Sequence, residues 1–386
     1  MKQITIPFKS NILTKNGYLN VESLTLKKKL TLENAPINFK VLDKNNKQIT
    51  TTYLFFEDKN IYKVKTLTGN IFYITEDTNL LCLTMEGKVI NKTIREILPT
   101  DEIISKVGDN ISDSKELLTE EDAYLLGYFY SINFSELIKT QDEKIYIPTN
   151  NSTFENIRDI IINKFDVCCE EKKLYIYNSN ININNYILQY NFNKNQIPDL
   201  IKESNINIQT SFVQGFYDVF TILEKNTIKK EINNDFFYND LLLLLKNLGI
   251  IAEKNTEFII RGEEIINYYN LIGFSNVDYE NKMLTFNLSK EDFYIINSLK
   301  KITQEFYKTV SNKKIELTED FEYTRNNIEN LLTLDGDEDL KNIIRPLIQE
   351  NICYDRIDTI EILANQKCIV LEINSEDTII IDSLII

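Results

Sequence analysis

The chain has 386 residues, of which 43% are hydrophobic, and it carries a net charge of −15 with no histidine. The missing histidine excludes Ser–His and Cys–His nucleophile pairs and imidazole metal sites. The negative charge disfavours non-specific binding to nucleic-acid phosphates unless basic residues gather locally. A chain of this length is expected to form two or three domains.

The cysteines, the apolar runs and the composition indicate the cellular setting. Five cysteines without a CxxC pair argue against a disulfide framework or a zinc site. No apolar run approaches the ~18 residues of a membrane-spanning helix, and the N-terminus lacks the apolar core of a signal peptide. Heavy use of Asn, Ile and Lys indicates an AT-rich genome, as in many large DNA viruses and some protozoa. We therefore expect a cytoplasmic or virion-associated protein that is neither secreted nor membrane-spanning.

Residues 3–118 are predicted to form short strands. The turn Lys15-Asn16-Gly17 predicts a hairpin that begins with a strand at 11–14. Further strands separated by turns are expected at 41–50, 61–66, 71–75 and 80–84. One helical turn is expected at 93–98, before Pro99. Short strands at this spacing indicate a compact all-β unit.

From residue 119 the pattern changes to helices alternating with strands. Thr119, followed by acidic residues, predicts a helix start, and apolar helices are expected at 124–133 and 211–220. Each has one interior glycine, Gly127 or Gly215, which costs about 1 kcal/mol against alanine. We therefore expect that the glycines allow the two helices to approach each other closely.

These two helices begin two copies of one pattern, namely helix, strand, helix, strand, helix. The copies are offset by the 88 positions between Gly127 and Gly215. The other elements expected of the first copy are at 144–147, 152–165, 173–177 and 184–190. Those expected of the second copy are at 227–232, 234–248, 257–260 and 263–271.

Residues 280–350 are predicted to be helical and charged, and the last forty or so residues return to strands. The run at 335–339 is expected to be an acidic loop. It lacks the ligand spacing of an EF-hand, so no metal and no other cofactor is expected. The final strands are expected at 355–363, 368–374, 378–381 and 384–386.

Several stretches, taken in their order along the chain, carry a family resemblance. They lie at 11–24, 67–77, 196–201, 212–218, 243–250 and 354–386. In this order they resemble an intein, or Hint (hedgehog/intein) domain, that carries a two-repeat LAGLIDADG homing endonuclease.

The resemblance implies an α+β fold with an interrupted domain. An all-β Hint-like domain would be built from both chain ends, 1–118 plus 350–386. A duplicated α/β LAGLIDADG-like domain would interrupt it at 119–300. Residues 301–349 are expected to form a helical, charged connector.

The chain departs from the family at the positions that splicing needs. Splicing requires a Cys or Ser nucleophile, an activating histidine and a final His-Asn pair. The nucleophile position falls near Thr5, and Thr78 replaces the histidine that should follow Thr75-Glu76-Asp77. The chain ends at Ile386, where the His-Asn pair would begin. We therefore expect no self-splicing.

The endonuclease positions depart in the same way. In the family, an acid near the C-terminal end of each motif helix holds the divalent metal. The matching positions are Ile132 and Phe220. Asp218 precedes Phe220 by two residues, its first-repeat counterpart is Tyr130, and Asn133 follows Ile132. Apolar side chains cannot bind Mg²⁺, whose ligands are oxygens, and Asp218 alone supplies half a site, so no catalytic residue and no metal ligand is expected.

DNA binding without cleavage is a separate question, because the family grips duplex DNA with a basic saddle of strands. Residues 121–300 contain 17 basic and 25 acidic residues. The lysines expected on or beside strands are Lys172, Lys173, Lys229 and Lys230. They form either a small basic strip or solvated strand edges, and the acidic charge favours solvated edges.

The sequence leads to one main hypothesis and two alternatives. We expect a domesticated, catalytically inactive intein-like protein that acts as a structural or interaction protein. Its partners would be proteins, with viral structural proteins as candidates, and not membranes. The first alternative is a DNA-binding protein, or a site-specific LAGLIDADG DNA endonuclease with residual activity. The second is a multi-domain scaffold whose resemblance to inteins is coincidental.

Overall fold

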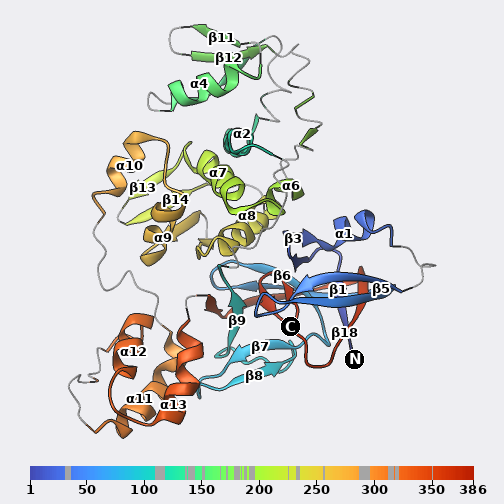
Figure 1. Ribbon diagram of the computed structural model, residues 1–386, viewed down its shortest axis with the longest axis vertical. Coiled ribbons are helices and arrows are strands. Elements are labelled where there is room, and N and C mark those ends of the chain that lie inside the picture. The colour runs from blue at the N-terminus through green and yellow to red at the C-terminus, as the bar shows by residue number, and fades with distance from the viewer. Residues whose placement is uncertain are drawn as a thin grey trace. The chain divides into compact units, whose positions relative to one another are not determined.

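A computed structural model describes residues 1–30, 36–108, 118–134, 137, 144–149, 153–165, 167–170, 173–177, 183, 185–186, 189–190, 196–224, 226–231, 235–254, 257–286, 296–311, 317, 321–349 and 351–386. The chain divides into two compact units. Unit 1 comprises Met1–Asp109 with Ser289–Ile386, and unit 2 comprises Asn110–Leu288. Each contains helices and sheets (Figure 1), and every strand pairing in the described residues is antiparallel. The protein is therefore of the α+β class, as the sequence predicts.

Unit 1 contains two sheets. The first has the order β1-β18-β5-β4, with β6 paired to β5, and the second has the order β3-β2-β19-β20-β9-β7-β8, with β17 paired to β9. The strands of the first sheet are β1 (Lys2–Pro7), β4 (Ile37–Leu42), β5 (Gln48–Thr66), β6 (Ile71–Thr75) and β18 (Ile357–Ile373). Those of the second are β2 (Asn11–Thr14), β3 (Gly17–Asn20), β7 (Leu80–Leu83), β8 (Val89–Lys92), β9 (Glu102–Lys106), β17 (Ile352–Asp355), β19 (Ile380–Ile381) and β20 (Leu384–Ile385).

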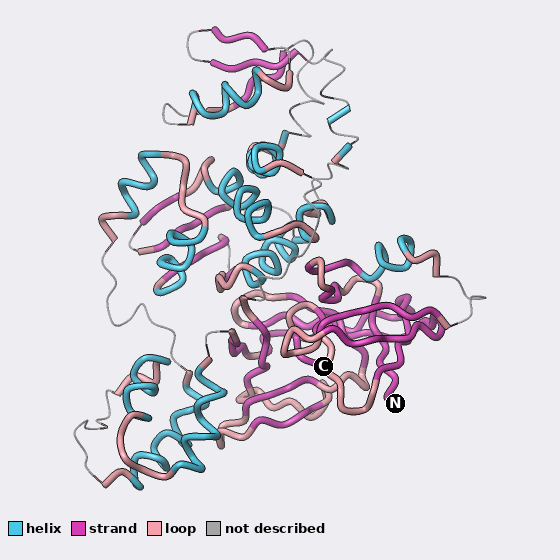
Figure 2. Tube along the Cα trace, in the orientation of Figure 1, coloured by secondary structure: helices cyan, strands magenta, loops and turns pink. Residues whose placement is uncertain are grey.

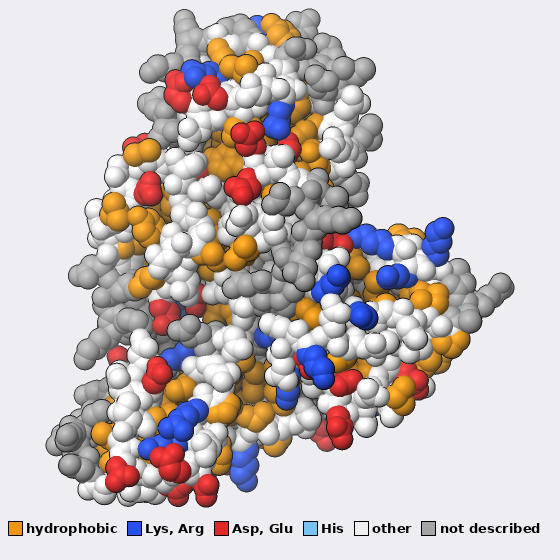
Figure 3. Space-filling model, viewed as in Figure 1, with side chains coloured by type: hydrophobic (Ala, Val, Ile, Leu, Met, Phe, Trp, Pro, Cys, Tyr) orange, Lys and Arg blue, Asp and Glu red, His pale blue; other side chains and the backbone are white. Residues whose placement is uncertain are grey.

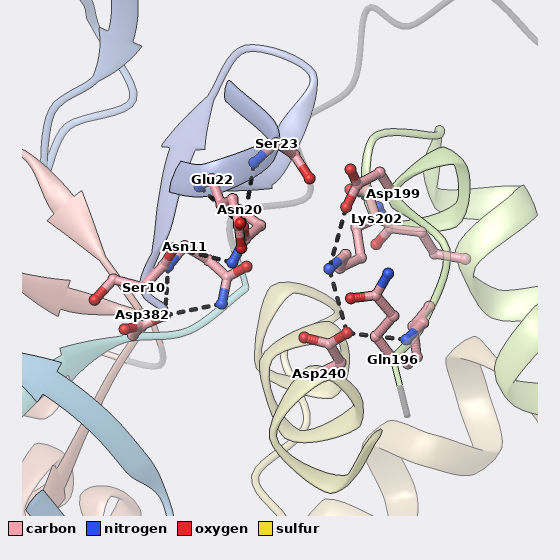
Figure 4. Close-up of polar contacts among 12 residues, drawn as sticks. Ser10, Asn11, Asn20, Glu22, Ser23, Gln196, Asp199, Lys202, Asp240 and Asp382 are labelled. Atoms are coloured by element: carbon pink, nitrogen blue, oxygen red, sulfur yellow. Dashed lines mark hydrogen bonds and ion pairs between the residues drawn. The ribbon is translucent and has the colours of Figure 1, made fainter. Parts of the chain in front are cut away.

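The turn residues of unit 1 produce the hairpins that the sequence predicts. Strands β2 and β3 pair across the turn before Gly17, whose φ of 99° favours glycine. Helix α1 (Val21–Lys27) follows β3, and the side chain of Asn20 caps it by accepting hydrogen bonds from the backbone N–H groups of Glu22 and Ser23 (Figure 4). The strand after Gly87 pairs back as β8. The helical turn expected at 93–98 is wrong, because these residues form a hydrogen-bonded turn without a helix.

The two long strands β5 and β18 pair along most of their length. The sequence predicts separate strands at 355–363 and 368–374, and the structure instead joins most of these residues in β18. The register shifts between Leu363 and Gln366, where Asn365 has a φ of 48°. This register shift is a β-bulge. It allows the strand to continue although the alternation of apolar and polar residues is interrupted there.

The helices near the C-terminus form one group beside the strands of unit 1 (Figure 2). They are the α-helices α11 (Lys300–Thr309), α12 (Arg325–Leu332) and α13 (Glu338–Ile344), with the short 3₁₀ helices η2 (Asn297–Leu299) and η3 (Arg345–Ile348). Their buried side chains include Phe306, Ile328 and Ile344, which share one apolar cluster with Leu83 of β7. These helices therefore belong to the core of unit 1.

The acidic run at 335–339 is a helix cap as well as a loop. Asp337 accepts hydrogen bonds from the backbone N–H groups of Asp339 and Leu340 and so begins α13. A β-carbon on Gly336 would lie 2.8 Å from the ring of Phe306. Local helix capping and packing thus account for this run.

Unit 2 contains two series of elements that share the order helix, strand, helix, strand, strand among the described residues, and the second series has the further elements β13 (Ile222–Glu224) and α9 (Glu263–Leu271). The first series comprises α2 (Glu120–Ser131), β10 (Lys144–Ile147), α4 (Phe154–Ile162), β11 (Val167–Glu170) and β12 (Lys173–Tyr177). The second comprises α7 (Ile206–Tyr217), β13, β14 (Thr227–Lys230), α8 (Asp235–Asn247), β15 (Glu253–Lys254), β16 (Phe258–Arg261) and α9. Helices α6 (Asp199–Lys202) and α10 (Val277–Met283) flank the second series. The strands β11, β13 and β15 are not predicted by the sequence, and much of the helix expected at 184–190 lies outside the described residues.

Helices α2 and α7 pack backbone to backbone. A β-carbon built on Gly127 would lie 1.9 Å from the carbonyl oxygen of Phe212, and one built on Gly215 would lie 2.0 Å from that of Tyr124. The contact is reciprocal, because Tyr124 and Phe212 occupy the same position in the two repeats. The predicted close approach of the two helices is confirmed.

The limits of α7 differ from the expected helix at 211–220. The helix begins at Ile206, because Asn205 caps it by accepting a hydrogen bond from the backbone N–H of Ile208. It ends at Tyr217, and Phe220 lies beyond the helix with a φ of 53°. Asp218, expected near the end of the helix, is its C-cap.

A buried ion pair fixes α6 against α8 within unit 2. The Lys202 ammonium lies 3.2 Å from an Asp240 carboxylate oxygen and 3.4 Å from one of Asp199 (Figure 4). The same Asp240 carboxylate accepts a hydrogen bond from the backbone N–H of Ile197. Burial alone would lower the pKa of Lys202, but the two carboxylates raise it.

Candidate functional site

The positions that resemble a splicing centre lie together in unit 1. Thr5, on β1, donates a hydrogen bond of 2.8 Å to a carboxylate oxygen of Glu57 on β5. The Lys59 ammonium donates to the Thr5 hydroxyl at 3.3 Å and lies 3.1 Å from Glu57 and 3.4 Å from Asp77. Lys59, on β5, therefore connects Thr5 and Asp77. The sequence did not predict that Lys59 belongs to this site.

Thr78 takes a structural role at the position where the resemblance leads us to expect histidine. Its hydroxyl oxygen accepts a hydrogen bond of 3.2 Å from the backbone N–H of Thr75. The two threonine hydroxyls are 2.9 Å apart, and the Thr75 hydroxyl also donates to Asp77. Both threonines are buried. These side chains close the turn after β6 and supply no base.

Lys59 and Asp77 are both held in their charged forms. Burial opposes the charge of Lys59, but the hydrogen bonds and charges of Glu57 and Asp77 raise its pKa above the ordinary value. Burial likewise opposes the charge of Asp77, but hydrogen bonds from Thr75 and its own backbone, together with the Lys59 charge, lower its pKa. At neutral pH Lys59 is therefore an ammonium, which has no lone pair to accept a proton, and the lowered pKa of Asp77 makes its carboxylate a weaker base than a free one.

Cys368 lies beside this cluster and is unreactive. It pairs with Pro7 of β1 and with Glu57 of β5 in the strand register. Burial raises the pKa of its thiol to about 12, and the residue is fully buried. Since the thiolate is the nucleophile, this cysteine cannot replace the missing one.

The positions that resemble metal ligands lie at the ends of α2 and α7 and carry no carboxylate. Ile132 is the buried C-cap of α2, and Asn133 follows it with a φ of 52°. Phe220 is 61% exposed. Tyr130 donates a hydrogen bond to the carbonyl of Gln196. These side chains provide no pair of oxygens for a divalent cation.

Asp218 is fully buried and its hydrogen bonds are made within the protein. The hydroxyls of Tyr124 and Ser275 donate to its carboxylate, Tyr124 at 2.7 Å. The backbone N–H groups of Ser275 and Asn276 donate to it as well, at 3.1 and 3.3 Å. Burial raises the pKa of Asp218, and these donors oppose the shift. The carboxylate therefore anchors the segment before α10 to the end of α7.

Lys230 is buried beside these helix ends, which the sequence did not predict. Its side chain points inward from β14 and donates hydrogen bonds to the Ser131 hydroxyl at 2.8 Å and to the Val219 carbonyl. It also lies 4.6 Å from the centre of the Phe216 ring. Burial lowers the pKa of Lys230 to about 7, and the charge of Asp218 opposes this shift. Lys230 thus connects the C-terminal ends of α2 and α7 through hydrogen bonds.

The four strand lysines do not form one basic strip. Lys173 is exposed, Lys229 lies 3.9 Å from Glu257, and Lys230 is buried, while Lys172 lies outside the described residues. The sequence predicts that Lys230 lies in a basic strip or at a solvated strand edge, and both predictions are wrong for this residue. Arg261, on the same sheet, pairs with Glu253 at 2.7 Å.

The sheet of the first repeat presents tyrosines with a lysine. The Lys144 ammonium lies 5.7 Å from the ring centre of Tyr175 and 5.9 Å from that of Tyr177. The rings of Tyr146 and Tyr175 are 5.6 Å apart. This grouping can be recognised in the sequence, because lysine and tyrosine alternate with apolar residues in 144–147 and 173–177, and residues at every second position share one face of a strand.

Comparisons with known proteins identify no relative. No family model matches the chain, and no curated protein matches it. The described residues contain no group of three or more Cys, Asp or Glu side chains placed to hold a metal ion. Every helix in the described ranges is too short or too polar to cross a bilayer.

Proposed function

We propose that this protein is a domesticated intein-like protein, with a Hint-like unit and a duplicated LAGLIDADG-like insert, that serves as a structural or interaction protein. The main observation behind this proposal concerns the polar groups at the positions that match the splicing and endonuclease sites. These groups are already bound to other groups of the protein by hydrogen bonds or ion pairs. Asp218 accepts hydrogen bonds from Tyr124 and Ser275, and Lys59 forms ion pairs with Glu57 and Asp77.

The packing of unit 2 supports retention of the fold without the reaction. The reciprocal contact of Gly127 and Gly215 requires a backbone approach that alanine would prevent. Phe220, where an active relative would present an acid, is exposed and has a backbone conformation that non-glycine residues seldom adopt. We infer that selection has kept the shape of this unit and given up its metal ligands.

A cleavage assay tests this proposal. The full chain is incubated with a random plasmid library in the presence of Mg²⁺ or Mn²⁺, with Asp218→Asn as the matched variant. We expect no site-specific cuts from either protein. Site-specific cuts by the native chain that disappear in Asp218→Asn would overturn the proposal.

One observation favours the alternative of a DNA-binding protein with residual endonuclease activity. Lys144, Tyr175 and Tyr177 combine a positive charge with aromatic faces, a combination that binds phosphates and stacks bases. This alternative predicts that Lys144→Glu abolishes a salt-dependent gel shift. The neutralised second sheet, with Lys229 near Glu257 and Arg261 bound to Glu253, offers it no comparable support.

A further inference from the structure

The charge of the chain is distributed unevenly. The whole chain has 43 basic and 58 acidic residues. Its first fifty residues have the opposite balance, with nine lysines against three acidic residues. The net charge of −15 therefore conceals a strongly basic N-terminal segment.

Six of these lysines are exposed and have no carboxylate within 4.0 Å among the described residues. We call them the lysine surface, and they are Lys9, Lys15, Lys28, Lys40, Lys44 and Lys47. Three lysines of β5 differ, since Lys59, Lys63 and Lys65 each pair with an acid. These six positive charges of the lysine surface are therefore available to an external anion.

The two described acidic residues of the segment, Asp43 and Glu22, form no ion pair with the lysine surface. The Asp43 carboxylate is buried in its own turn, where it accepts hydrogen bonds of 2.8 Å from the backbone N–H groups of Asn45 and Lys47. Glu22 is exposed in the first turn of α1. Glu33 lies outside the described residues.

The elements that carry these lysines are neighbours within unit 1. Strand β2 pairs with β3, contacts β4, and β3 leads directly into α1. Lys15 lies in the turn between β2 and β3, Lys40 lies on β4, and Lys28 is the C-cap of α1. Figure 3 shows basic side chains gathered over the part of unit 1 that includes α1 and β3.

The composition of this surface favours phosphates over a protein partner. Protein interfaces are depleted in lysine and have an apolar or aromatic centre. The exposed large apolar residues in the described part of the first fifty are Met1 and Leu26 alone. Lysines without an apolar centre are instead what neutralises the phosphates of nucleic acids.

We propose that the lysine surface of unit 1 binds the phosphate backbone of nucleic acid without regard to its sequence. The inference rests on the proposed interaction role and names its partner class. It assigns the binding site to unit 1 and not to the strands of unit 2. Lysine provides point charges without the planar fork of arginine, and phosphate contacts carry no direct sequence information, so we expect binding without sequence preference.

A binding titration tests the inference on the full chain. Fluorescently labelled duplex DNA of about 20 base pairs and a single-stranded RNA of equal length are titrated by anisotropy between about 50 and 200 mM salt. We expect both to bind, with a slope of log K against log salt of roughly −3 to −5 for the duplex, since about 0.9 counterions are released per phosphate contact. The absence of binding at about 50 mM salt would overturn the inference.

Two charge-reversal variants locate the site. Lys15→Glu/Lys28→Glu/Lys44→Glu should weaken binding at least tenfold at about 50 mM salt. The matched control is Lys282→Glu/Lys301→Glu/Lys308→Glu, which reverses three exposed lysines from other parts of the chain and should change binding by less than about twofold. An equal loss in both variants would contradict the inference, and so would loss in Lys144→Glu/Lys173→Glu with none in the first variant.

A competitor distinguishes the class of partner. Poly-glutamate at the same charge concentration should displace the duplex less well than unlabelled DNA. Equal displacement would show that the surface takes acidic protein, and would overturn the assignment to nucleic acid. Cleavage of the duplex on addition of Mg²⁺ would instead contradict the proposed loss of chemistry while leaving the binding surface in place, so the two failures are distinguishable.

Discussion

Gly127 and Phe212 are in direct backbone contact across two helices, and a β-carbon on the glycine would lie 1.9 Å from the phenylalanine carbonyl oxygen. The second repeat provides the reciprocal contact between Gly215 and Tyr124. No rotamer change can relieve such a clash, because the backbone fixes the position of the β-carbon and the atom that it meets is a backbone carbonyl oxygen. The two helices therefore define the centre around which unit 2 is packed.

Gly127→Ala and Gly215→Ala should each destabilise the protein. Overpacking by one methyl group usually costs about 1–3 kcal/mol, and a backbone clash should cost at least the upper end of that range. Chemical denaturation followed by circular dichroism measures the change. Ser211→Ala on the same helix is the control and should change stability by less than about 0.5 kcal/mol. Glycine variants as stable as the control would contradict the backbone contact.

Lys230 should make stability depend on pH above neutrality. Its folded pKa is about 7, below the unfolded value of about 10.4. Between these values the unfolded state binds the extra proton, so the free energy of unfolding should rise with pH, by up to about 4 kcal/mol in total. Lys230→Met should remove this rise and stabilise the protein below pH 7, where the native residue buries a cation.

Thermal melts at pH 6, 8 and 9.5 check the Lys230 prediction. Lys173→Met is the control, because Lys173 is exposed, and it should keep the rise. A pH profile of Lys230→Met that matches the native one would show that another group is responsible.

Asp218 should stabilise the fold and not bind a metal ion. Asp218→Ala leaves buried donors of Tyr124, Ser275 and Asn276 without an acceptor, which should cost about 2–4 kcal/mol. Addition of Mg²⁺ or Mn²⁺ should leave the melting temperature of the native chain unchanged, since a ligand that binds the folded state raises it. A metal-dependent rise that disappears in Asp218→Asn would contradict this prediction.

Lys59 should contribute stability between acid and strongly alkaline pH. The folded pKa of Asp77 is lowered, so its contribution is present above about pH 4 and is lost as the pH falls through its folded pKa. The folded pKa of Lys59 is raised, so its contribution is lost only as the pH rises through that value. Lys59→Met should therefore lower stability at pH 7 by about 1 kcal/mol or less, because the pair is part-exposed.

Melting temperatures at pH 3 and pH 7 test the Lys59 prediction. The difference between Lys59→Met and the native chain should shrink at pH 3, where the acids become protonated. Lys367→Met, an exposed lysine of the same sheet, is the control. A difference that is larger at pH 3 than at pH 7 would be inconsistent with the ion pair.

The hairpins and caps could be predicted because they depend on neighbours in sequence. The turn before Gly17 and the Thr119 cap of α2, for example, lie where the sequence places them. The short strands β11, β13 and β15 could not be predicted, because two to four residues give too little alternation to detect. The continuous strand β18 could not be predicted, because the alternation pattern breaks near Asn365. Pairing with β5 on both sides of the bulge keeps the strand continuous despite this break.

The sequence by itself determined the repeat, the two interior glycines and the absence of imidazole chemistry, because periodicity, residue type and composition are local properties. Only the tertiary structure placed Lys59 between Thr5 and Asp77 and buried Lys230 beside the ends of α2 and α7. It also left six N-terminal lysines with no carboxylate within 4.0 Å among the residues that the structure describes. These features depend on which strands become neighbours and on where a side chain meets water. Burial and charge pairing arise between residues far apart in the chain, so they follow from the packed fold and not from any one segment.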